Sequence, residues 1–239
     1  MSRPGNSLRS PMSRREEIIG WIYLVIHMFI LSYLLALMNT RLFPLLHWKQ
    51  LDTARLNLVY YGFGFVFLLI FLFEYLRKSF SDMLGNLGGT LGAVLLGYAA
   101  YFVSIYAASW LLTKLLGNSV NPNSAAILAE TKLNPNAMLV IGVLLAPMVE
   151  ETLFRGVVFG TIRKKSRFLA YAVSALLFAL YHLLSYFLGG HDWTVLLYLI
   201  QYIPAALILA WCYERGRSIW APVFLHMLIN CVSITVNLG

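Results

Sequence analysis

Long apolar runs separated by short polar connections constrain this chain of 239 residues more than any other feature. A helix needs about 20 residues to cross a hydrocarbon core about 30 Å thick, where only helices and closed barrels satisfy their backbone polar groups. The chain is 60% hydrophobic and 12% charged, whereas charged residues make up about 25% of an average soluble domain. The sequence therefore predicts an all-α fold, a polytopic transmembrane helical bundle.

Seven membrane helices are expected, or eight if the third run divides into a spanning helix and an interfacial one. Their ranges are 18–38, 57–76, 88–116, 137–160, 168–189, 193–213 and 218–238. The connection 117–135 is rich in Asn and Pro and is expected to be a loop. No internal repeat or soluble linker stands out in the sequence. We therefore expect residues 1–239 to form one integral membrane domain, in which the helices of 137–238 carry the chemistry.

The basic residues predict the orientation of the helices. Lys and Arg gather in alternate connections, and such clusters face the cytoplasm. They include Arg14, Arg15, Arg77, Lys78, Arg163, Lys164, Lys165, Arg167, Arg215 and Arg217. We therefore expect a multi-pass protein of a bacterial plasma membrane with its N-terminus in the cytoplasm. The net charge of +8 is spread over these connections and forms no stripe, so the expected partner is the lipid bilayer and not nucleic acid.

Two adjacent carboxylates, Glu150 and Glu151, lie inside the apolar run 137–160. A charge near the bilayer centre costs about 2.5–3.5 kcal/mol on insertion scales, so such groups are kept mainly where they pair, line a cavity or do chemistry. Arg155 follows Glu151 by four positions, and the two therefore share a helix face on which they can pair. One helical step turns Glu150 about 100° away from Glu151, which leaves Glu150 free for a different role.

Two later runs carry further polar groups at helical spacing. His182 follows Phe178 by four positions, so the aromatic ring can pack against the imidazole. In the last run, Asn230 follows His226 by four positions. Counting 1.5 Å per residue from the expected cytoplasmic ends places these groups and Glu150 at similar depths. We therefore expect Glu150, His182, His226 and Asn230 to meet in one wet pocket.

These residues carry a resemblance to a known family. Glu150, Glu151 and Arg155 form Glu-Glu-x-x-x-Arg, Phe178 and His182 form Phe-x-x-x-His, and His226 and Asn230 form His-x-x-x-Asn. The ordered trio resembles the motif set of the CPBP intramembrane proteases, also called the type II CAAX protease or Abi family. The resemblance runs from Glu150 to Asn230 on successive helices and implies an intramembrane endopeptidase.

The resemblance also implies roles for the site residues. Glu150 and His182 would hold and deprotonate the attacking water, and His226 and Asn230 would stabilise the oxyanion. Glu151 and Arg155 complete the catalytic set, either directly or as an electrostatic support. The cofactor stays open between none and a zinc ion, because two histidines and one glutamate make a credible set of three zinc ligands. The sequence lacks the His-Glu-x-x-His pattern that places two histidines on one helix face.

The substrate and two rival functions stay open at this stage. A membrane-associated or secreted peptide or protein is the expected substrate, with or without a lipid. The same buried carboxylates and histidines also suit a proton- or ion-coupled transporter. A non-catalytic immunity or scaffold protein that has kept the fold is the third reading. His27, in the first run, has no motif partner and is expected to be a packing residue.

Overall fold

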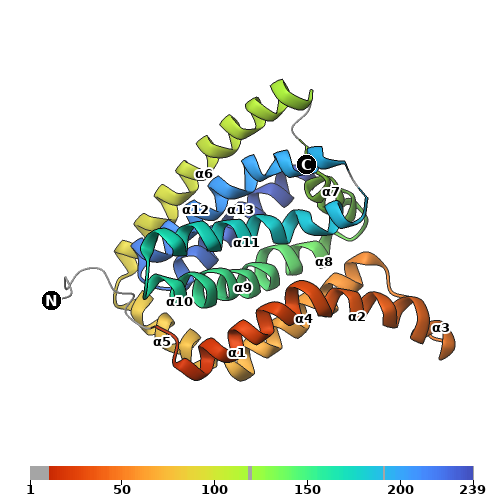
Figure 1. The fold of residues 1–239 in the computed structure, drawn as a ribbon, viewed down its shortest axis with the longest axis horizontal. Coiled ribbons are helices and arrows are strands. Elements are labelled where there is room, and N and C mark those ends of the chain that lie inside the picture. Colours follow the sequence, from red (N-terminus) through yellow and green to blue (C-terminus); the bar gives the residue numbers. More distant parts are fainter. Residues whose placement is uncertain (1–10, 118–119, 191, 239) are drawn as a thin grey trace.

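The computed structural model describes residues 11–117, 120–190 and 192–238, and within these ranges it contains helices and no strand. The polytopic helical bundle predicted from the sequence is thereby confirmed. Figure 1 shows the arrangement: the first helix and α4 form one side, α6 lies on the opposite side, and α9, α11, α12 and α13 lie between them.

The elements follow one another in a single order along the chain. The first five are continuous in one long helix: α1 (Arg14–Val25), η1 (Ile26–Leu31), α2 (Ser32–Leu37), η2 (Met38–Leu42) and α3 (Phe43–Leu45). Next come α4 (Thr53–Phe71), α5 (Phe73–Leu84), α6 (Leu87–Leu116) and α7 (Pro122–Leu133). A second composite helix contains α8 (Pro135–Leu139), η3 (Val140–Leu145), α9 (Ala146–Glu151), η4 (Thr152–Phe159) and α10 (Gly160–Arg163). The chain ends with α11 (Arg167–Leu188), η5 (Trp193–Tyr198), α12 (Leu199–Gly216) and α13 (Trp220–Leu238).

Six helices of the described chain are long and apolar enough to cross a membrane. They are Arg14–Leu45, Thr53–Phe71, Leu87–Leu116, Pro135–Arg163, Arg167–Tyr186 and Trp193–Gly216. The seventh expected run is also helical, but Trp220–Val236 is a shorter apolar helix. The expected count of seven spans therefore stays a prediction.

Two expected boundaries were wrong. The run 57–76 is not one helix, because it breaks at Leu72 (φ −120°, ψ 15°) and continues as the separate helix α5. The connection 117–135 is not a loop, because most of it forms α7. Its Asn and Pro residues begin helices: the Asn121 side chain accepts a hydrogen bond from the Ser124 backbone N–H at 2.8 Å, and Pro122 occupies the first turn. Asn caps and early prolines are favourable helix starts, so the same residues that punctuate loops began a helix here.

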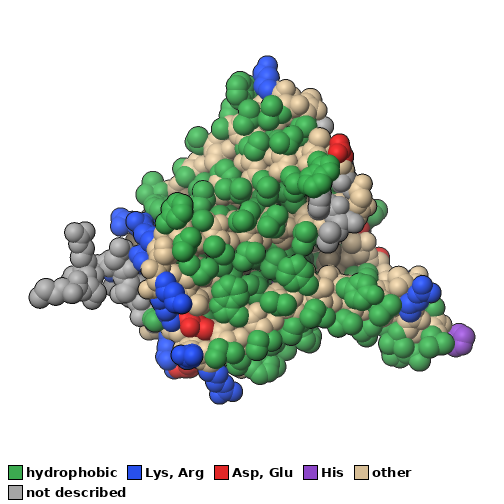
Figure 2. Space-filling model, viewed as in Figure 1, with side chains coloured by type: hydrophobic (Ala, Val, Ile, Leu, Met, Phe, Trp, Pro, Cys, Tyr) green, Lys and Arg blue, Asp and Glu red, His purple; other side chains and the backbone are tan. Residues whose placement is uncertain are grey.

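The surface shows the expected division of charge along the bundle. Hydrophobic side chains cover most of the face in Figure 2, and basic side chains gather at the end where α1 begins and where α5 and α10 lie. At that end Glu214 of α12 pairs with Arg163 and Arg167, at 2.7 and 2.8 Å. The assignment of this end to the cytoplasm stays a prediction.

The core of the bundle surrounds the fourth span, Pro135–Arg163. In this span 67% of the most apolar window is buried within the protein, against 22–39% in the other five spans. Helices α4, α11 and α13 all pack against it. The two acidic residues of the predicted site therefore lie on the span that is most enclosed by other helices among the six of the described chain.

Candidate active site

Glu150 and Glu151 end α9, just before the helix widens into the π-type turns of η4. Such widened turns occur often at functional sites, because they rotate side chains relative to a regular helix. The exposed fraction is 3% for Glu150 and 0% for Glu151. Because ionisable groups this deeply buried need partners, each carboxylate has its own set of neighbours.

The Glu151 carboxylate is held in a dense network. The Arg155 Nη1 donates to Glu151 Oε1 at 3.1 Å, which confirms the pairing predicted from their spacing. The His226 Nδ1 lies 2.8 Å from the same oxygen. The second arm of Arg155 donates from Nη2 to the Ala206 carbonyl at 3.1 Å, and its guanidinium lies 4.2 Å from the centroid of the Phe178 ring. Glu151 and Arg155 thus join the fourth span to α11, α12 and α13.

The Glu150 carboxylate has a sparser environment. Tyr61 of α4 donates its hydroxyl hydrogen to Oε1 at 2.7 Å. The other oxygen, Oε2, lies 3.7 Å from His182 Nε2 and accepts no hydrogen bond from any residue that the structure describes. One carboxylate oxygen is therefore fixed by the protein, and the other faces an imidazole with its lone pairs available.

The backbone of α11 sets the orientation of His182. Its Nδ1 lies 2.9 Å from the Phe178 carbonyl, which can only accept, so Nδ1 carries the hydrogen and Nε2 presents a lone pair toward Glu150. The Phe178 ring packs against the imidazole with centroids 4.5 Å apart, as the spacing predicts. Tyr202 of α12 stacks on the imidazole at 4.8 Å and 27°. The ring is therefore fixed by one hydrogen bond and two aromatic contacts.

Asn230 is anchored to the fourth span. Its side-chain Nδ2 donates to the Gly142 carbonyl in η3 at 2.8 Å. An amide nitrogen carries two hydrogens, so the second remains available for another acceptor. The contact also satisfies a carbonyl in a stretch of widened turns.

Four of the six predicted site residues line a single cavity of about 510 Å³. They are Glu150, His182, His226 and Asn230, and the expected meeting of these groups is therefore observed. Glu151 and Arg155 lie behind the cavity wall, where both side chains are fully buried. The structure thus separates the six residues into a group of four at the cavity and a supporting pair.

Sequence reasoning missed two residues of this site. Tyr61 bonds Glu150, and Tyr202 packs on His182. The only signal for Tyr61 was a polar hydroxyl within an apolar run. The close approach of α4 to α9 brings Tyr61 to Glu150. A Cβ added to Gly64 would lie only 3.0 Å from the Val149 side chain, so a glycine at this position lets the two helices pack closely.

A catalytic zinc site needs three protein ligands grouped around one point. Among the described residues, no three His, Cys, Asp or Glu side chains are grouped so that they could hold a metal ion. The Nδ1 atoms of His182 and His226 are both engaged with protein oxygens, at 2.9 and 2.8 Å, so Nε2 is the nitrogen of each ring that could ligate a metal.

Comparisons with known proteins agree with the motifs. The model of the type II CAAX prenyl endopeptidase Rce1-like family matches residues 132–232. The candidate membrane peptidase YdiL of Bacillus subtilis (strain 168) is 25% identical over 69% of this chain and 62% of its own length. The membrane-embedded CAAX protease MroQ of Staphylococcus aureus (strain USA300) is 27% identical over 57% of this chain and 53% of its own length.

A third relative, protein YxdF of Lactococcus lactis subsp. lactis (strain IL1403), is 31% identical over 36% of this chain and 42% of its own length. The chain thus matches less than two thirds of the length of each of these three relatives. No solved structure matches the chain. Residues 132–232 are thus similar to the Rce1-like type II CAAX prenyl endopeptidase family, in agreement with the three motifs.

Proposed function

We propose that this protein is an intramembrane endopeptidase that hydrolyses a peptide bond in a membrane-associated or secreted peptide or protein. The observation that carries the proposal is the meeting of Glu150, His182, His226 and Asn230 at one cavity, with a carboxylate oxygen and an imidazole lone pair 3.7 Å apart. A base, a second water-holding group and two polar side chains are the parts that peptide hydrolysis needs.

Glu150 and His182 are the pair that orients and deprotonates the water. A water molecule within about 2.8 Å of both Glu150 Oε2 and His182 Nε2 can donate one hydrogen to each. Its oxygen lone pair is then directed away from both groups, toward the scissile carbonyl carbon. As the oxygen attacks, Glu150 takes the proton, and it later delivers that proton to the leaving amine. General acid–base catalysis of this kind contributes about 10²–10⁴-fold.

His226 and Asn230 are the groups assigned to the oxyanion. Asn230 has an amide hydrogen left after its bond to Gly142, and His226 can donate from Nε2 when its ring is protonated. The Glu151 carboxylate at 2.8 Å from Nδ1 stabilises positive charge on that ring. Arg155 fixes Glu151 in turn. The supporting pair therefore acts on the reaction through His226, and removal of one oxyanion donor costs about 10²–10³-fold in kcat elsewhere.

The test compares purified wild-type protein with Glu150→Gln, His182→Ala and His226→Ala on a peptide library in liposomes. Each variant is expected to lose cleavage by at least 10²-fold. Glu74→Gln is the matched control, because Glu74 is also a carboxylate but pairs with Arg77 on the exposed face of α5. Wild-type rates in all three site variants would refute the protease site and leave the transporter and scaffold readings.

The same preparations also address the metal and the substrate class. Cleavage that survives complete chelation and metal analysis would exclude a zinc mechanism, and cleavage that returns only with added zinc would require one. Lipidated and unlipidated forms of one peptide, compared at equal concentration, separate a prenyl-peptide protease from a general membrane endopeptidase.

A further inference from the structure

A chain of hydrogen bonds runs from the first membrane span to Glu150. His27 in η1 is fully buried, and its Nε2 lies 3.3 Å from the Tyr181 hydroxyl on α11. The Tyr181 hydroxyl lies 3.1 Å from that of Tyr61 on α4. Tyr61 lies 2.7 Å from Glu150 Oε1. Three helices therefore contribute one polar group each to a line that ends on the fourth span.

The chemistry of the end groups fixes the direction of every bond in the line. Because a carboxylate only accepts, the Tyr61 hydrogen goes to Glu150 and the Tyr61 oxygen must accept from Tyr181. Tyr181 has a single hydroxyl hydrogen, so its own oxygen accepts from His27 Nε2. This tautomer leaves His27 Nδ1 as an acceptor, and the Tyr23 hydroxyl lies 3.4 Å from it. One assignment thus satisfies His27, Tyr181, Tyr61 and Glu150 together.

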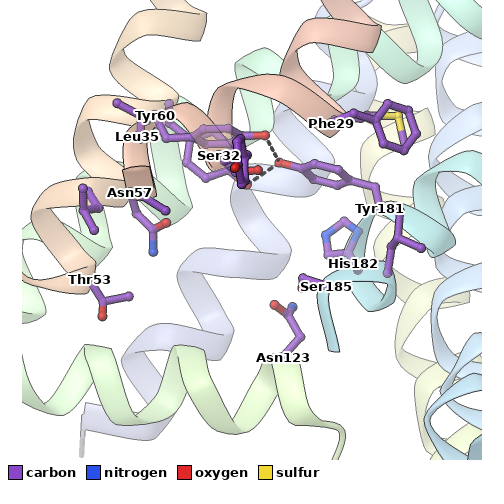
Figure 3. A pocket seen from close by; sticks show the side chains of 16 residues that line it. Phe29, Ser32, Leu35, Thr53, Asn57, Tyr60, Asn123, Tyr181, His182 and Ser185 are labelled. Carbon is purple, nitrogen blue, oxygen red and sulfur yellow. Dashed lines mark hydrogen bonds between the residues drawn. The ribbon is translucent and has the colours of Figure 1, made fainter. Parts of the chain in front are cut away.

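A neighbouring hydroxyl, that of Tyr60, lies beside the line. Tyr60 donates to the His27 backbone carbonyl at 2.7 Å. Its hydrogen is therefore used, so the Tyr60 oxygen, 3.2 Å from the Tyr181 hydroxyl, competes with the Tyr61 oxygen at 3.1 Å for the single Tyr181 hydrogen. Figure 3 shows Tyr181 reaching across a cavity of about 620 Å³ toward Tyr60, with His182 on the next position of α11. This second cavity and the one at Glu150 share Tyr61 and His182.

We infer that His27, Tyr181 and Tyr61 form a one-way donor chain that positions the Glu150 carboxylate, with Oε1 held and Oε2 left as the base. The inference rests on the proposed function of Glu150. Tyr61, Tyr181 and His27 are positioning residues, because they act on the reaction through Glu150 and do not touch the substrate. Hydrogen bonds in a line polarise one another in a low dielectric, so each donor strengthens the next.

The three donors come from two different parts of the sequence. His27 and Tyr61 lie outside residues 132–232, the part that the family model matches, and only Tyr181 lies within it. The motif-bearing half supplies the carboxylate, and the first two helices supply the donors that orient it. The N-terminal half is therefore a component of the site and not only a membrane anchor.

The main test is Tyr61→Phe in the full-length protein, which removes one hydroxyl and keeps the ring. It is expected to lower kcat about tenfold or more, the usual effect of losing a hydrogen bond to a charged group, with KM unchanged. Tyr75→Phe is the matched control. Tyr75 is also buried and its hydroxyl pairs with that of Tyr213 at 3.0 Å, away from Glu150. It should keep the wild-type kcat.

Two further variants distinguish positioning from packing. His27→Gln keeps a donor toward Tyr181 and is expected to retain more activity than His27→Leu, which has no donor. Tyr181→Phe leaves α4 untouched, so it tests the line even if Tyr61→Phe fails to fold, and its kcat should fall less than that of Tyr61→Phe. Equal kcat in Tyr61→Phe, Tyr181→Phe, Tyr75→Phe and wild type, with Glu150→Gln inactive, would overturn the inference and leave the proposed function intact.

A spectroscopic measurement tests the chain independently of activity. The infrared carboxyl bands of Glu150, isolated as the difference between wild type and Glu150→Gln, should shift in Tyr61→Phe and stay unchanged in Tyr75→Phe. Unshifted bands in Tyr61→Phe would contradict the inference. If instead Glu150→Gln cleaves peptides as fast as wild type, the proposed function fails, and the infrared bands alone decide whether the donor chain exists.

Discussion

The two adjacent carboxylates point to different sides of one helix, and the two sides have different chemistry. On the Glu151 side Arg155 and His226 both bond Oε1 of the acid, and Oε2 has no hydrogen-bond partner among the described residues. On the Glu150 side one tyrosine bonds one oxygen, and the other oxygen faces His182 and a cavity. Each acid keeps one oxygen without a hydrogen bond from the described residues, so the two differ in their surroundings: Glu151 pairs with a buried cation, and Glu150 faces a cavity.

This difference shows how a membrane protein can keep charges at depth for two purposes. A buried ion pair is costly to form, and removing one partner leaves an uncompensated charge, so the Glu151 network should matter most for stability. Glu150 bonds one tyrosine and pairs with no arginine or lysine, so it should add less to stability and matter most for activity. Variants on the two sides should therefore separate these two properties.

The largest effect is expected from Arg155→Leu. It removes the cation from a fully buried pair and leaves Glu151 with His226 alone, so the free energy of unfolding should fall by about 3–5 kcal/mol. Arg167→Leu is the matched control, because Arg167 pairs with Glu214 at a more exposed position, where such pairs contribute about 0–1 kcal/mol. Unfolding in detergent measures both, and equal losses would contradict the comparison.

His226 belongs to both sides, so its variant should lose both properties. His226→Gln removes the bond to Glu151 and is expected to cost about 1.5–3 kcal/mol of stability together with at least 10²-fold in kcat. His182→Gln should lose activity to a similar extent with a stability loss of about 1 kcal/mol, since only one neutral hydrogen bond to Phe178 is removed. Thermal unfolding and cleavage rates, measured on the same preparations, test both variants. A stable but inactive His226→Gln would show that His226 acts only on the Glu150 side.

The approach of α4 to the fourth span offers a test on a smaller scale. Gly64→Val places a branched side chain against Val149 and the Tyr23 hydroxyl and should cost about 1–3 kcal/mol by overpacking. Gly62→Val, two positions earlier, projects into open space and should be close to neutral. Gly64→Val should also lower kcat, because it moves Tyr61 away from Glu150. Equal stability of the two variants would mean that α4 is free to shift.

Spacing within a helix explains which features could be predicted from the sequence. The pairing of Glu151 with Arg155 and the packing of Phe178 on His182 follow from four-residue intervals on one face. The shared cavity of Glu150, His182 and Asn230 required only a common depth. The spacings depend only on the geometry of a single helix. The depths depend only on the number of residues from the membrane surface, which is counted in the same way for every helix.

Contacts between helices were not predictable in this way, because the sequence does not state how each helix is rotated about its axis. The bond from Tyr61 to Glu150 joins residues 89 positions apart, and that from His226 to Glu151 joins residues 75 apart. His27 was expected to be a packing residue for the same reason, since its partner Tyr181 lies on a distant helix. The prediction of a loop at 117–135 was wrong because helix caps and loops use the same residue types, here Asn121 and Pro122.

The smallest expected effect concerns α7, which covers the Glu150 side. Asn121 caps α7, and it also bonds Gln201 at 2.6 Å and accepts from the Tyr202 hydroxyl at 3.2 Å. Asn121→Ala should cost about 1 kcal/mol, the usual value of a lost cap. Because Tyr202 stacks on His182, we expect faster amide hydrogen exchange in α7 and a modestly reduced kcat.

The control for this variant is Asn136→Ala, a change of the same kind on the exposed surface of α8. It should leave exchange in α7 and cleavage unchanged. Amide exchange in η4, behind the Glu151 side, should be the same in both variants, since none of the Asn121 bonds reaches Glu151 or Arg155. Faster exchange in η4 on loss of Asn121 would show that the two sides of the fourth span are coupled, and that the Glu151 network depends on the helix that covers the Glu150 side.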